Sequence, residues 1–481
     1  MQLSPVLNIL GLLTAMLGAT MLLPMCFDLY YGSGDWHVFA MSSLLTAFVG
    51  VSVWLATSQR EPLNLGLRQA FLLTNGSWML IGLFGSIPFM FSSLDLSFTD
   101  AVFESVSGIT TTGSTVLAEI EAASPGILIW RALLQWLGGV GIVVMAMAVL
   151  PMLSVGGMQL FRTESYESAD KVVPRAAQLA GGIGLVYTSL TAIWAIMLAM
   201  AGMDFFDAIA HAMTTIATGG YSTKTASIAA FDSVAIEWIV IGGMIVGSLP
   251  FAHYLAMVRG GWQALLKDPQ VRWFIILLIS VVMMLIWYLY QAGMGLAEAT
   301  RQASFNAVSI MTGTGYGSAN FSAWGGFAST LLLISMFIGG CGGSTTCGIK
   351  VFRLQVLATT ARVQISRLLR PHAVVLAYYN RRPVSAEVMD SVMGFFYLYI
   401  LCFVMLAILL GMMGLDFITA LSGAATSISN VGPGLGNLIG AEGNFAAIPD
   451  AAKWVMAFGM LLGRLELFTV LVMLNPTFWQ R

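Results

Sequence analysis

The chain has 481 residues, of which 58% are hydrophobic and only 9% are charged, whereas about 25% of the residues in a soluble globular domain are charged. Together with a mean hydropathy of +0.85, this composition excludes a soluble protein and indicates one that lies in a lipid bilayer. The formal net charge of −2 says little as a sum, and the four cysteines have no CxxC spacing, so neither a disulfide framework nor a zinc site is expected.

About ten apolar runs are distributed along the chain, each near the ~20 residues that cross a bilayer core. Their centres lie near Ala15, Leu44, Leu83, Val143, Leu190, Ile245, Ile279, Leu333, Val404 and Leu462. The first run has no preceding Lys or Arg and no small-residue cleavage site before Asp28, so we interpret it as a retained helix rather than a signal peptide. The sequence therefore predicts an all-α polytopic membrane protein with ten transmembrane helices.

Charged residues are distributed unequally between alternate loops. Sixteen of the 21 basic residues fall on one side: Arg60, Arg68, Arg162, Lys171, Arg175, Arg259, Lys267, Arg272, Lys350, Arg353, Arg362, Arg367, Arg370, Arg381, Arg382 and Arg481. The opposite loops are mainly acidic and carry Asp28, Asp35, Asp95, Asp100, Asp204, Asp207, Asp232, Glu237, Glu298, Asp416, Glu442 and Asp450. The positive-inside rule places the basic side and the N-terminus in the cytoplasm. An acidic outer vestibule would concentrate cations.

Four segments between the spanning runs align with one another without gaps. They read DAVFESVSGITTTG (100–113), DAIAHAMTTIATGG (207–220), QASFNAVSIMTGTG (302–315) and TALSGAATSISNVG (419–432). A helix of nine or ten residues covers only ~15 Å, so each segment is expected to enter the membrane, continue as extended backbone and return. Irregular backbone at membrane depth must be enclosed by protein or line an aqueous cavity. We therefore expect four re-entrant loops around one axis; a helix-packing motif of small residues is the alternative.

The repeats divide the chain into five parts. Two extra helices occupy 1–60, and four units of helix, loop and helix occupy 61–155, 156–260, 261–385 and 386–481. Carbonyl oxygens in the loops can replace the hydration shell of an alkali cation. Glycine permits the backbone angles that turn carbonyls inward, and each short helix directs its partly negative C-terminal end toward the cation.

The motifs around the four terminal glycines carry a resemblance to a known family. ESVSGITTTGST, ATGGYST, TGTGYGSAN and NVGPG resemble, in this order, the filter segments of the TrkH and TrkG type of membrane subunit in bacterial Trk potassium uptake systems, within the Trk, Ktr and HKT superfamily. The resemblance covers nearly the whole chain. It implies a potassium filter made of Thr111, Thr112, Gly113, Thr218, Gly219, Gly220, Gly313, Thr314, Gly315, Asn430, Val431 and Gly432.

Two features of this filter remain open in the sequence. In the second segment Gly219 and Gly220 are adjacent, so either could be the terminal glycine, and the gapless alignment favours Gly220. Each segment has one filter glycine where strongly selective potassium channels have two, in TVGYG. We therefore expect rubidium and some sodium to pass as well as potassium.

The last apolar run of the third unit is interrupted by GGCGGSTTCG at 339–348, whose glycines and polar residues are expected to unwind a helix. By resemblance this is an intramembrane gating loop, formed by Gly339, Gly340, Gly342, Gly343, Ser344, Thr345, Thr346 and Gly348. A kinked helix is the alternative. The GxxxxG spacing imitates a phosphate loop, but Ile349 displaces the required lysine to position 350, so nucleotide binding is not expected here.

Two ionisable residues lie at membrane depth. Arg464 is near the centre of the final run, where a charge usually faces a cavity or a partner. The resemblance implies that it lines the pore below the filter as an electrostatic barrier; an ion pair with a buried carboxylate such as Glu104 is the alternative. We interpret His211 as a packed residue rather than a proton carrier.

The sequence thus predicts potassium and rubidium uptake across the bacterial inner membrane, driven by the membrane potential at ~2.3 kcal/mol per charge per 100 mV. The resemblance implies a homodimer gated by a cytosolic TrkA-type ring, which binds nucleotides itself. No organic cofactor, nucleic acid or catalytic residue is expected, and cotransport of a proton or sodium ion stays open. A secondary transporter of an organic solute is the alternative, although such proteins typically have two inverted repeats. A membrane enzyme would need convergent carboxylates, histidines or a metal motif.

Overall fold

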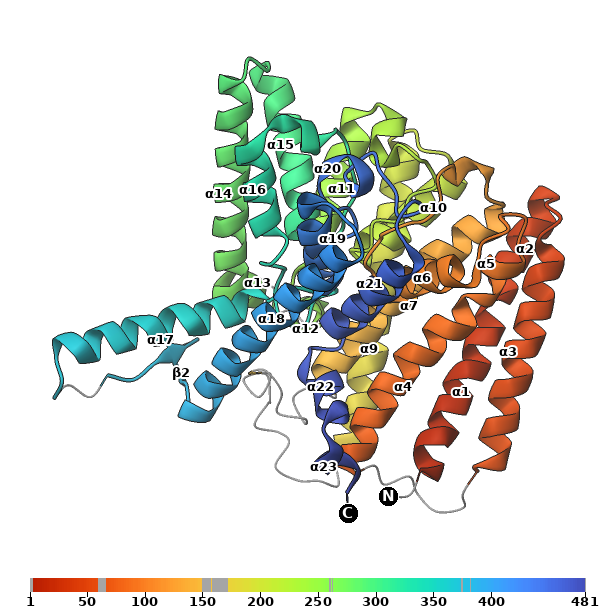
Figure 1. Cartoon of the computed structure of the whole chain (residues 1–481), viewed down its shortest axis with the longest axis horizontal. Helices are drawn as coiled ribbons and strands as arrows, with labels where there is room; N and C mark the ends of the chain where they lie inside the picture. Colours follow the sequence, from red (N-terminus) through yellow and green to blue (C-terminus); the bar gives the residue numbers. More distant parts are fainter. Residues whose placement is uncertain are drawn as a thin grey trace.

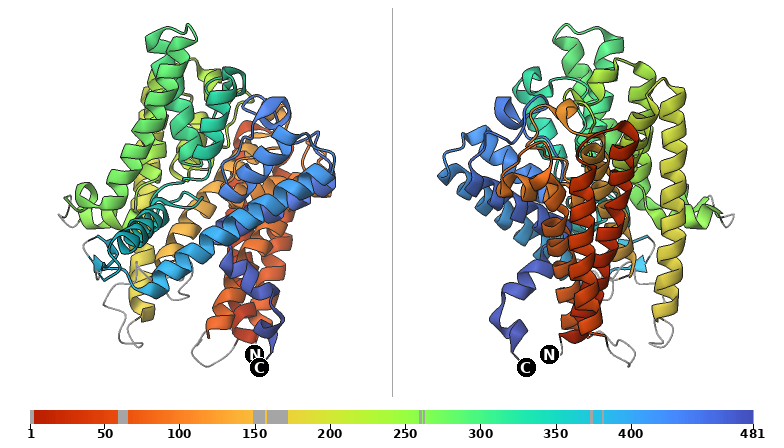
Figure 2. Two further views of the ribbon diagram at one scale, coloured as in Figure 1. Left: turned by 60° about the vertical axis from the view of Figure 1, so that its left-hand side comes forward. Right: turned by 90° about the vertical axis from the view of Figure 1, so that its right-hand side faces the viewer.

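The computed structural model describes residues 3–58, 66–148, 157, 172–258, 261, 263–372, 375–380 and 382–480. Most of them lie in helices (Figure 1). Both ends of the described chain lie at one face of the molecule, which we name the terminal face, and the turn between α14 (Pro269–Gln291) and α15 (Leu296–Met311) lies at the opposite face (Figures 1 and 2).

Not all of the residues behind the predicted orientation can be placed. Arg60, Arg162, Lys171, Arg259, Arg381 and Arg481 lie outside the described residues, and only the backbone of Arg175 and Arg382 is described. Arg68 is placed, and its guanidinium donates to the carbonyl of Gln480 at the terminal face. The cytoplasmic location of this face stays a prediction.

The elements are described by the parts into which we divided the chain, and that division stays a prediction. The N-terminal part contains α1 (Ser4–Thr20), α2 (Leu22–Tyr31) and α3 (Trp36–Ala56). The first unit contains α4 (Leu67–Gly85), α5 (Ile87–Phe91), α6 (Phe98–Ile109), η1 (Ile120–Ala122) and α7 (Pro125–Ala148). The second contains α9 (Val172–Met200), α10 (Phe205–Ile216), η5 (Ser227–Phe231), α11 (Val234–Gly247) and α12 (Phe251–Val258).

The third unit contains α13 (Gln263–Lys267), α14, α15, η6 (Phe321–Trp324), α16 (Gly326–Ser335) and α17 (Val351–Leu369), followed by β1 (Tyr378–Tyr379) and β2 (Arg382–Pro383). The fourth contains α18 (Ala386–Met412), α19 (Phe417–Ser429), α20 (Gly436–Ile439), α21 (Asp450–Arg464), α22 (Phe468–Leu474) and α23 (Pro476–Trp479). The two short antiparallel strands form the only sheet in the described part of the chain, so the all-α prediction needs this small amendment.

Seven helical segments of the described chain are long and apolar enough to cross a bilayer: Ser4–Tyr31, Trp36–Ala56, Leu67–Phe91, Pro125–Met147, Ala180–Met200, Pro269–Gln291 and Ala386–Met412. Two further pairs meet the same criterion but bend, α11 with α12 by 93° and α21 with α22 by 116°. The remaining predicted run, near Leu333, forms only the ten-residue helix α16. Three of the ten predicted spans are therefore broken, and the count of ten stays a prediction.

Each bend has a local cause. Pro250 lies between α11 and α12, and proline can neither donate a helical hydrogen bond nor follow a helical residue without a clash. After α21 the chain passes through Glu466 (φ 62°) and Leu467 (φ 36°), which leaves the right-handed helical region. The breaks lie where the second long helix of units two, three and four passes beneath the short helices.

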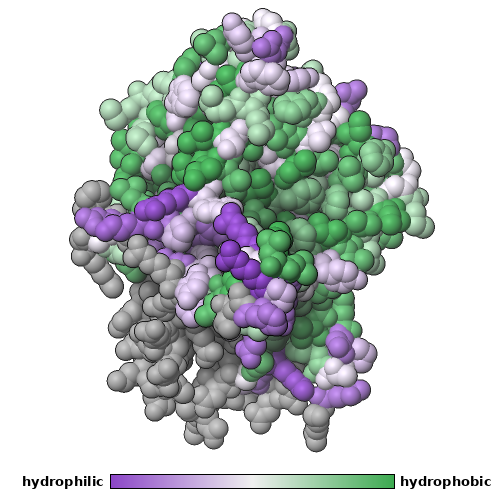
Figure 3. Space-filling view, turned by 90° about the vertical axis from the view of Figure 1, so that its left-hand side faces the viewer, coloured by the Kyte–Doolittle hydropathy of each residue, from purple (hydrophilic) through white to green (hydrophobic). Residues whose placement is uncertain are grey.

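The outer surface agrees with a lipid environment. On one side of the molecule, hydrophobic residues cover most of the upper part, and hydrophilic residues gather in a band below them (Figure 3). Along α14 the exposed side chains include the large hydrophobic residues Ile276, Ile279, Met283, Met284 and Trp287. Such a continuous apolar face is expected of a helix that faces lipid.

Candidate functional site

Four short helices, α6, α10, α15 and α19, occupy the centre of the four units and are buried along most of their length. Side chains cap three of their N-termini: Ser97 accepts from Asp100 N, Asp204 from Phe206 N and Asp416 from Thr419 N. Such caps replace the hydrogen bonds that the first turn of a helix lacks. For these three helices, the sequence therefore determines where the helix begins.

The sign of φ alternates in the segment that follows each short helix. Positive φ occurs at the terminal glycine and two residues before it: Thr111 (54°) and Gly113 (87°), Thr218 (50°) and Gly220 (78°), Gly313 (72°) and Gly315 (84°), Asn430 (53°) and Gly432 (98°). The extended backbone that we expected would point successive carbonyls to opposite sides. Alternation instead turns successive peptide groups toward one side, so consecutive carbonyl oxygens can face the same space.

The four segments contact one another in cyclic order. A Cβ atom built on each terminal glycine would overlap a carbonyl oxygen of the next segment: Gly113 with Gly219 O (2.2 Å), Gly220 with Thr314 O (1.9 Å), Gly315 with Val431 O (2.0 Å) and Gly432 with Thr112 O (2.8 Å). Asn430 Nδ2 also donates to Thr112 Oγ1 at 2.8 Å. The structure therefore brings the twelve predicted filter residues together as one ring, which we name the filter ring.

The backbone also bears on the uncertain register of the second segment. The positive φ values fall at Thr218 and Gly220, in the same places as at Thr111 and Gly113. Gly219 has no positive φ and corresponds to Thr112. The geometry therefore favours Gly220 as the terminal glycine.

A hydroxyl in each short helix stabilises the filter ring. The eighth residue of the repeat donates to a carbonyl at or just after the terminal glycine in three units: Ser107 to Ser114 O at 2.6 Å, Ser309 to Tyr316 O at 2.7 Å and Thr426 to Gly432 O at 2.9 Å. In the second unit Thr214 Oγ1 instead lies 2.5 Å from the Tyr316 hydroxyl. These bonds join each segment to its own helix or to its neighbour.

A hollow on the side of the filter ring away from the gating loop is lined by the four terminal glycines and by Arg131 and Lys224. No carboxylate occurs among the described residues that line it. Lys224 Nζ lies 3.6 Å from Asp207 Oδ2 and Arg131 pairs with Glu104. The expectation of an acidic vestibule is therefore wrong for the described lining of this hollow, where the two charged side chains, Arg131 and Lys224, are basic.

Glu121 lies beyond this rim and contacts the second unit. Its Oε1 accepts from Thr225 N at 2.9 Å, and its other oxygen accepts from the Thr225 hydroxyl. Burial raises the pKa of the Glu121 carboxyl, but the hydrogen bonds from Thr225 outweigh it and leave the pKa below its ordinary value. The contact joins units one and two where the chain leaves the filter ring.

The residues between α16 and α17 form a buried folded loop rather than a kinked helix, so the kinked-helix alternative is wrong. Gly339, Gly343 and Gly348 have φ of 67°, 77° and 78°. Gly340 N donates to Thr346 Oγ1 at 3.0 Å, and Ser344 Oγ lies 2.8 Å from the same hydroxyl. Gly342 N donates to Gln270 Oε1 of α14 at 2.9 Å. The predicted gating residues therefore belong to one compact loop.

This loop contacts the filter ring through Thr345. Thr345 Oγ1 lies 3.0 Å from Thr218 Oγ1 and donates to Gly247 O at 2.9 Å and to Ile216 O at 3.2 Å. The loop is thus held against the second filter segment and against the end of α11.

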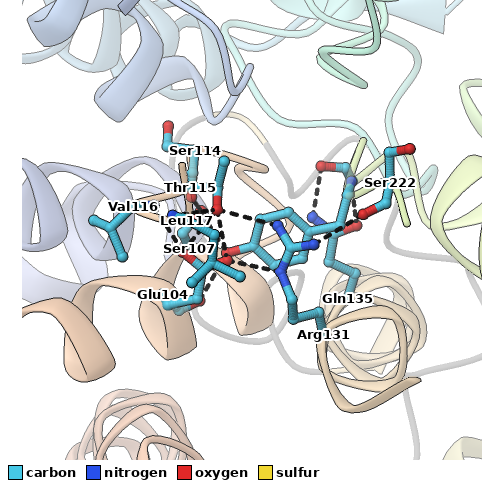
Figure 4. Close-up of polar contacts among 11 residues, drawn as sticks. Glu104, Ser107, Ser114, Thr115, Val116, Leu117, Arg131, Gln135 and Ser222 are labelled. Atoms are coloured by element: carbon cyan, nitrogen blue, oxygen red, sulfur yellow. Dashed lines mark hydrogen bonds and ion pairs between the residues drawn. The ribbon is translucent and has the colours of Figure 1, made fainter. Parts of the chain in front are cut away.

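Arg464 contacts the same loop. Its Nη1 donates to Thr345 O at 3.0 Å and to Cys347 Sγ at 2.9 Å, and its Nη2 donates to Gly138 O of α7 at 2.7 Å. The side chain is buried, and no described carboxylate lies within ion-pair distance of it. Glu104 pairs with Arg131, with 2.8 Å between Oε1 and Nε (Figure 4). The alternative that Glu104 pairs with Arg464 is therefore wrong.

Sequence reasoning missed a buried group of charges on the far side of the gating loop. Glu466 Oε1 lies 2.8 Å from Lys350 Nζ, and its other oxygen contacts Arg353. The Arg353 guanidinium also lies 3.8 Å from the ring centre of Phe395. Lys350 and Arg353 closely follow the glycine-rich run, and Glu466 follows Arg464 by two residues. These neighbouring positions were the signal by which the sequence could have indicated the charge group.

It also missed Gln135 of α7, which is fully buried. Its Nε2 donates to Gly219 O at 2.6 Å and its Oε1 accepts from Tyr221 N at 3.0 Å. No group of three or more His, Cys, Asp or Glu side chains that could hold a metal ion occurs among the described residues. The oxygens that the filter ring offers are backbone carbonyls, hydroxyls and the side-chain amide oxygen of Asn430.

Comparisons with known proteins agree over the full length. The model of the TrkH family, described as a cation transport protein, matches residues 36–480. The chain is 43% identical over 480 residues to the Trk system potassium uptake protein TrkI of Halomonas elongata, covering 99% of this chain and 97% of that protein. It is 36% identical over 489 residues to TrkH of Escherichia coli K12, covering 100% of both. The crystal structure of the potassium transporter TrkH from Vibrio parahaemolyticus superposes with a TM-score of 0.92 at 37% identity, covering 100% of both chains.

Proposed function

This chain belongs to the TrkH family of cation transport proteins, which are ion transporters rather than enzymes, and on that premise we propose that it takes up potassium through a channel-like pore. Rubidium, with similar coordination chemistry, passes as well. The pathway runs through the filter ring and is closed beneath it by the gating loop.

The observation that carries this proposal is the cyclic contact between terminal glycines and neighbouring carbonyls. Four segments with the same alternation of φ present carbonyl oxygens to one axis, and such oxygens can replace the water around a potassium ion. The short helices α6, α10, α15 and α19 direct their negative ends to the same place. No side-chain carboxylate belongs to the filter ring, which suits an ion that must leave as readily as it enters.

The gating loop and Arg464 supply the closed state in this proposal. The loop fills the space beneath Thr218, and the Arg464 guanidinium adds a positive charge without a described carboxylate partner. Both would repel or obstruct a cation, so conduction requires the hydrogen bonds of Thr345 to break. The resemblance implies a homodimer and a cytosolic TrkA-type nucleotide-binding ring as the partner that drives this change.

The terminal face is cytoplasmic and the hollow above the filter ring faces the periplasm in this proposal, with the chain in the bacterial inner membrane. The distribution of basic residues supports this orientation. A negative interior then drives cations inward. A secondary transporter of an organic solute is disfavoured because four segments, rather than two inverted halves, meet at the site.

Rubidium uptake into liposomes that hold the purified protein tests the proposal under a set membrane potential. We expect uptake that potassium competes away and that Gly113→Ser and Gly315→Ser both abolish. Gly411→Ala is the control, because a Cβ at Gly411 meets no atom within 4 Å. If neither the wild type nor a variant that lacks residues 339–348 shows uptake, the proposed pore is wrong. The alternative, a secondary transporter of an organic solute, is then favoured.

A further inference from the structure

The fifth residue of the repeat differs in every unit although its place is the same. It is Glu104, His211, Asn306 and Gly423. In the first three units this side chain contacts the chain just beyond the terminal glycine: Glu104 Oε2 accepts from Val116 N at 2.9 Å, His211 Nε2 lies 2.9 Å from Ser222 Oγ, and Asn306 Nδ2 donates to Ser318 Oγ at 3.0 Å. From unit one to unit four, this position therefore has a carboxylate, an imidazole, an amide and finally no side chain.

In the first unit this residue belongs to a network that contains an ion pair and joins two filter segments (Figure 4), whereas the contact in the second unit between the His211 carbonyl and the Tyr316 hydroxyl is neutral. Arg131 of α7 donates from Nε to Glu104 Oε1 at 2.8 Å and from Nη2 to Thr115 Oγ1 at 3.1 Å, both in unit one. Its Nη1 donates to Ser222 O at 2.8 Å, just beyond the second segment. A single guanidinium thus spans the boundary between segments one and two.

One helical turn later on α7, Gln135 holds the second segment on both sides of its terminal glycine, at Gly219 O and Tyr221 N. The Tyr221 ring lies 4.0 Å from the Arg131 guanidinium carbon, and its hydroxyl donates to Glu104 O at 2.8 Å. We name Glu104, Arg131, Gln135 and Tyr221 the brace. All four side chains are buried.

The brace resists displacement more than the neutral contacts elsewhere in the filter ring. Charge-assisted hydrogen bonds are shorter and stronger than neutral ones, and a buried charge that loses its partner is strongly destabilised. A movement of segment one or two toward the axis must lengthen several of these bonds together. In unit four Gly423 offers no side chain for such a bond.

From this geometry we propose that the brace determines ion specificity by holding the carbonyls of segments one and two at a spacing suited to potassium. A sodium ion is smaller and would need these carbonyls to move inward. The brace lies on the side of the segments away from the axis and opposes that contraction. Its members are positioning residues that do not contact the ion. This inference rests on the proposed potassium function and adds the determinant of its specificity.

The experiment compares sodium and potassium as competitors of rubidium uptake in liposomes under a set potential. The measured quantity is the sodium concentration that halves uptake divided by the potassium concentration that does so. This ratio does not depend on how much protein is folded. Glu104→Gln removes the charge of the brace at nearly constant volume. Gln135→Met removes both hydrogen bonds to the second segment and leaves no buried charge unpaired, so it tests the brace even where Glu104→Gln fails to fold.

The matched control is Lys453→Gln. It breaks an ion pair with Asp100, on the same short helix as Glu104, with 2.5 Å between Nζ and Oδ1. Among the described residues, the polar contacts of the Lys453 side chain are with Asp100, Ala446 O and Asp450, none of which belongs to the filter ring, so the ratio should stay at the wild-type value. We expect the ratio to fall by about tenfold in Glu104→Gln, equivalent to about 1.4 kcal/mol, and by a smaller factor in Gln135→Met.

The outcomes separate the two proposals. A wild type without potassium-sensitive uptake would overturn the transport function and this inference with it. A wild type that transports while Gln135→Met keeps the wild-type ratio would overturn the brace alone. A ratio that falls equally in Lys453→Gln would also overturn it, because any lost ion pair would then have the same effect.

Discussion

The filter ring and the region beneath it differ in how far the four units resemble one another. In the filter ring each unit has the same alternation of φ, a glycine against the next carbonyl and a hydroxyl at the eighth position. Beneath it, α11 and α12 bend by 93°, α21 and α22 bend by 116°, and α16 and α17 are separated by the gating loop. Similarity is retained where all four units meet in the ring, and it is lost in the region beneath, where the long helices of three units are broken.

The two regions also differ in charge. The filter ring offers neutral carbonyls and hydroxyls, whereas Arg464, Lys350, Arg353 and Glu466 lie buried around the gating loop. Buried charges need partners, so they define one arrangement sharply and penalise others. Five substitutions test two proposals: that the ring conducts through backbone geometry shared by the four units, and that the region beneath it is closed by individual side chains.

The largest effect is expected from Gly220→Ala. The new Cβ would lie 1.9 Å from Thr314 O, in a residue with φ of 78°. Because neither the backbone nor the neighbouring carbonyl can yield without breaking the filter ring, rubidium uptake should fall by about a hundredfold or more. Gly411→Ala should transport normally. Retained uptake in Gly220→Ala would show that the cyclic contact is not needed.

Glu466→Gln should lower stability more than any neutral change in the filter ring. Lys350 and Arg353 would stay buried without their carboxylate, which costs about 3–5 kcal/mol of unfolding free energy. Thermal unfolding in detergent measures the loss. Asp450→Asn removes the charge of an exposed carboxylate from Lys453, which keeps its ion pair with Asp100, so it should change stability by less than about 0.5 kcal/mol. Equal shifts in both variants would contradict the structural role of Glu466.

Arg464→Ala should raise uptake instead of lowering it. The substitution removes the donors to Thr345 O and Gly138 O and the positive charge beneath the filter ring. Basal rubidium uptake without any cytosolic partner should rise by about tenfold, which corresponds to about 1.4 kcal/mol of barrier. Arg464→Lys keeps the positive charge, so its basal rubidium uptake should lie between that of the wild type and that of Arg464→Ala. Unchanged uptake in Arg464→Ala would exclude this residue from the closed state.

The smallest effects should come from Ser107→Ala and Ser309→Ala, and they should equal each other. Each removes one hydroxyl bond to a carbonyl beyond the terminal glycine, worth about 1 kcal/mol. Rubidium uptake should fall by a similar small factor in both, roughly two- to fivefold. A large difference between them would show that the filter ring is less regular in energy than in geometry.

The filter ring could be predicted from the sequence because its signal is local. Fourteen consecutive residues contain the short helix, the hydroxyl and the terminal glycine, and they occur four times. The gating loop was recognisable for the same reason, since glycines and polar residues interrupt an apolar run. The extended backbone was a wrong detail, because the sequence does not encode the sign of φ at Thr111, Thr218 or Asn430.

The partners of the buried charges could not be predicted. Lys350 and Glu466 are separated by 116 residues, and Arg131 and Ser222 by 91. Which of several intramembrane charges pair depends on how the units surround the axis, and no periodicity reports that. For this reason Glu104 was weighed as a partner for Arg464, when a nearer arginine on α7 holds it.

The difference between Glu104, His211, Asn306 and Gly423 also has an evolutionary side. In a pore assembled from four identical chains, one codon change alters all four equivalent positions at once. When four segments of a single chain form the ring, a mutation can change one of the equivalent positions and leave the other three as they are. Selection can therefore change one quarter of such a ring while the other three quarters stay the same, and the four fifth positions of this chain do differ from one another.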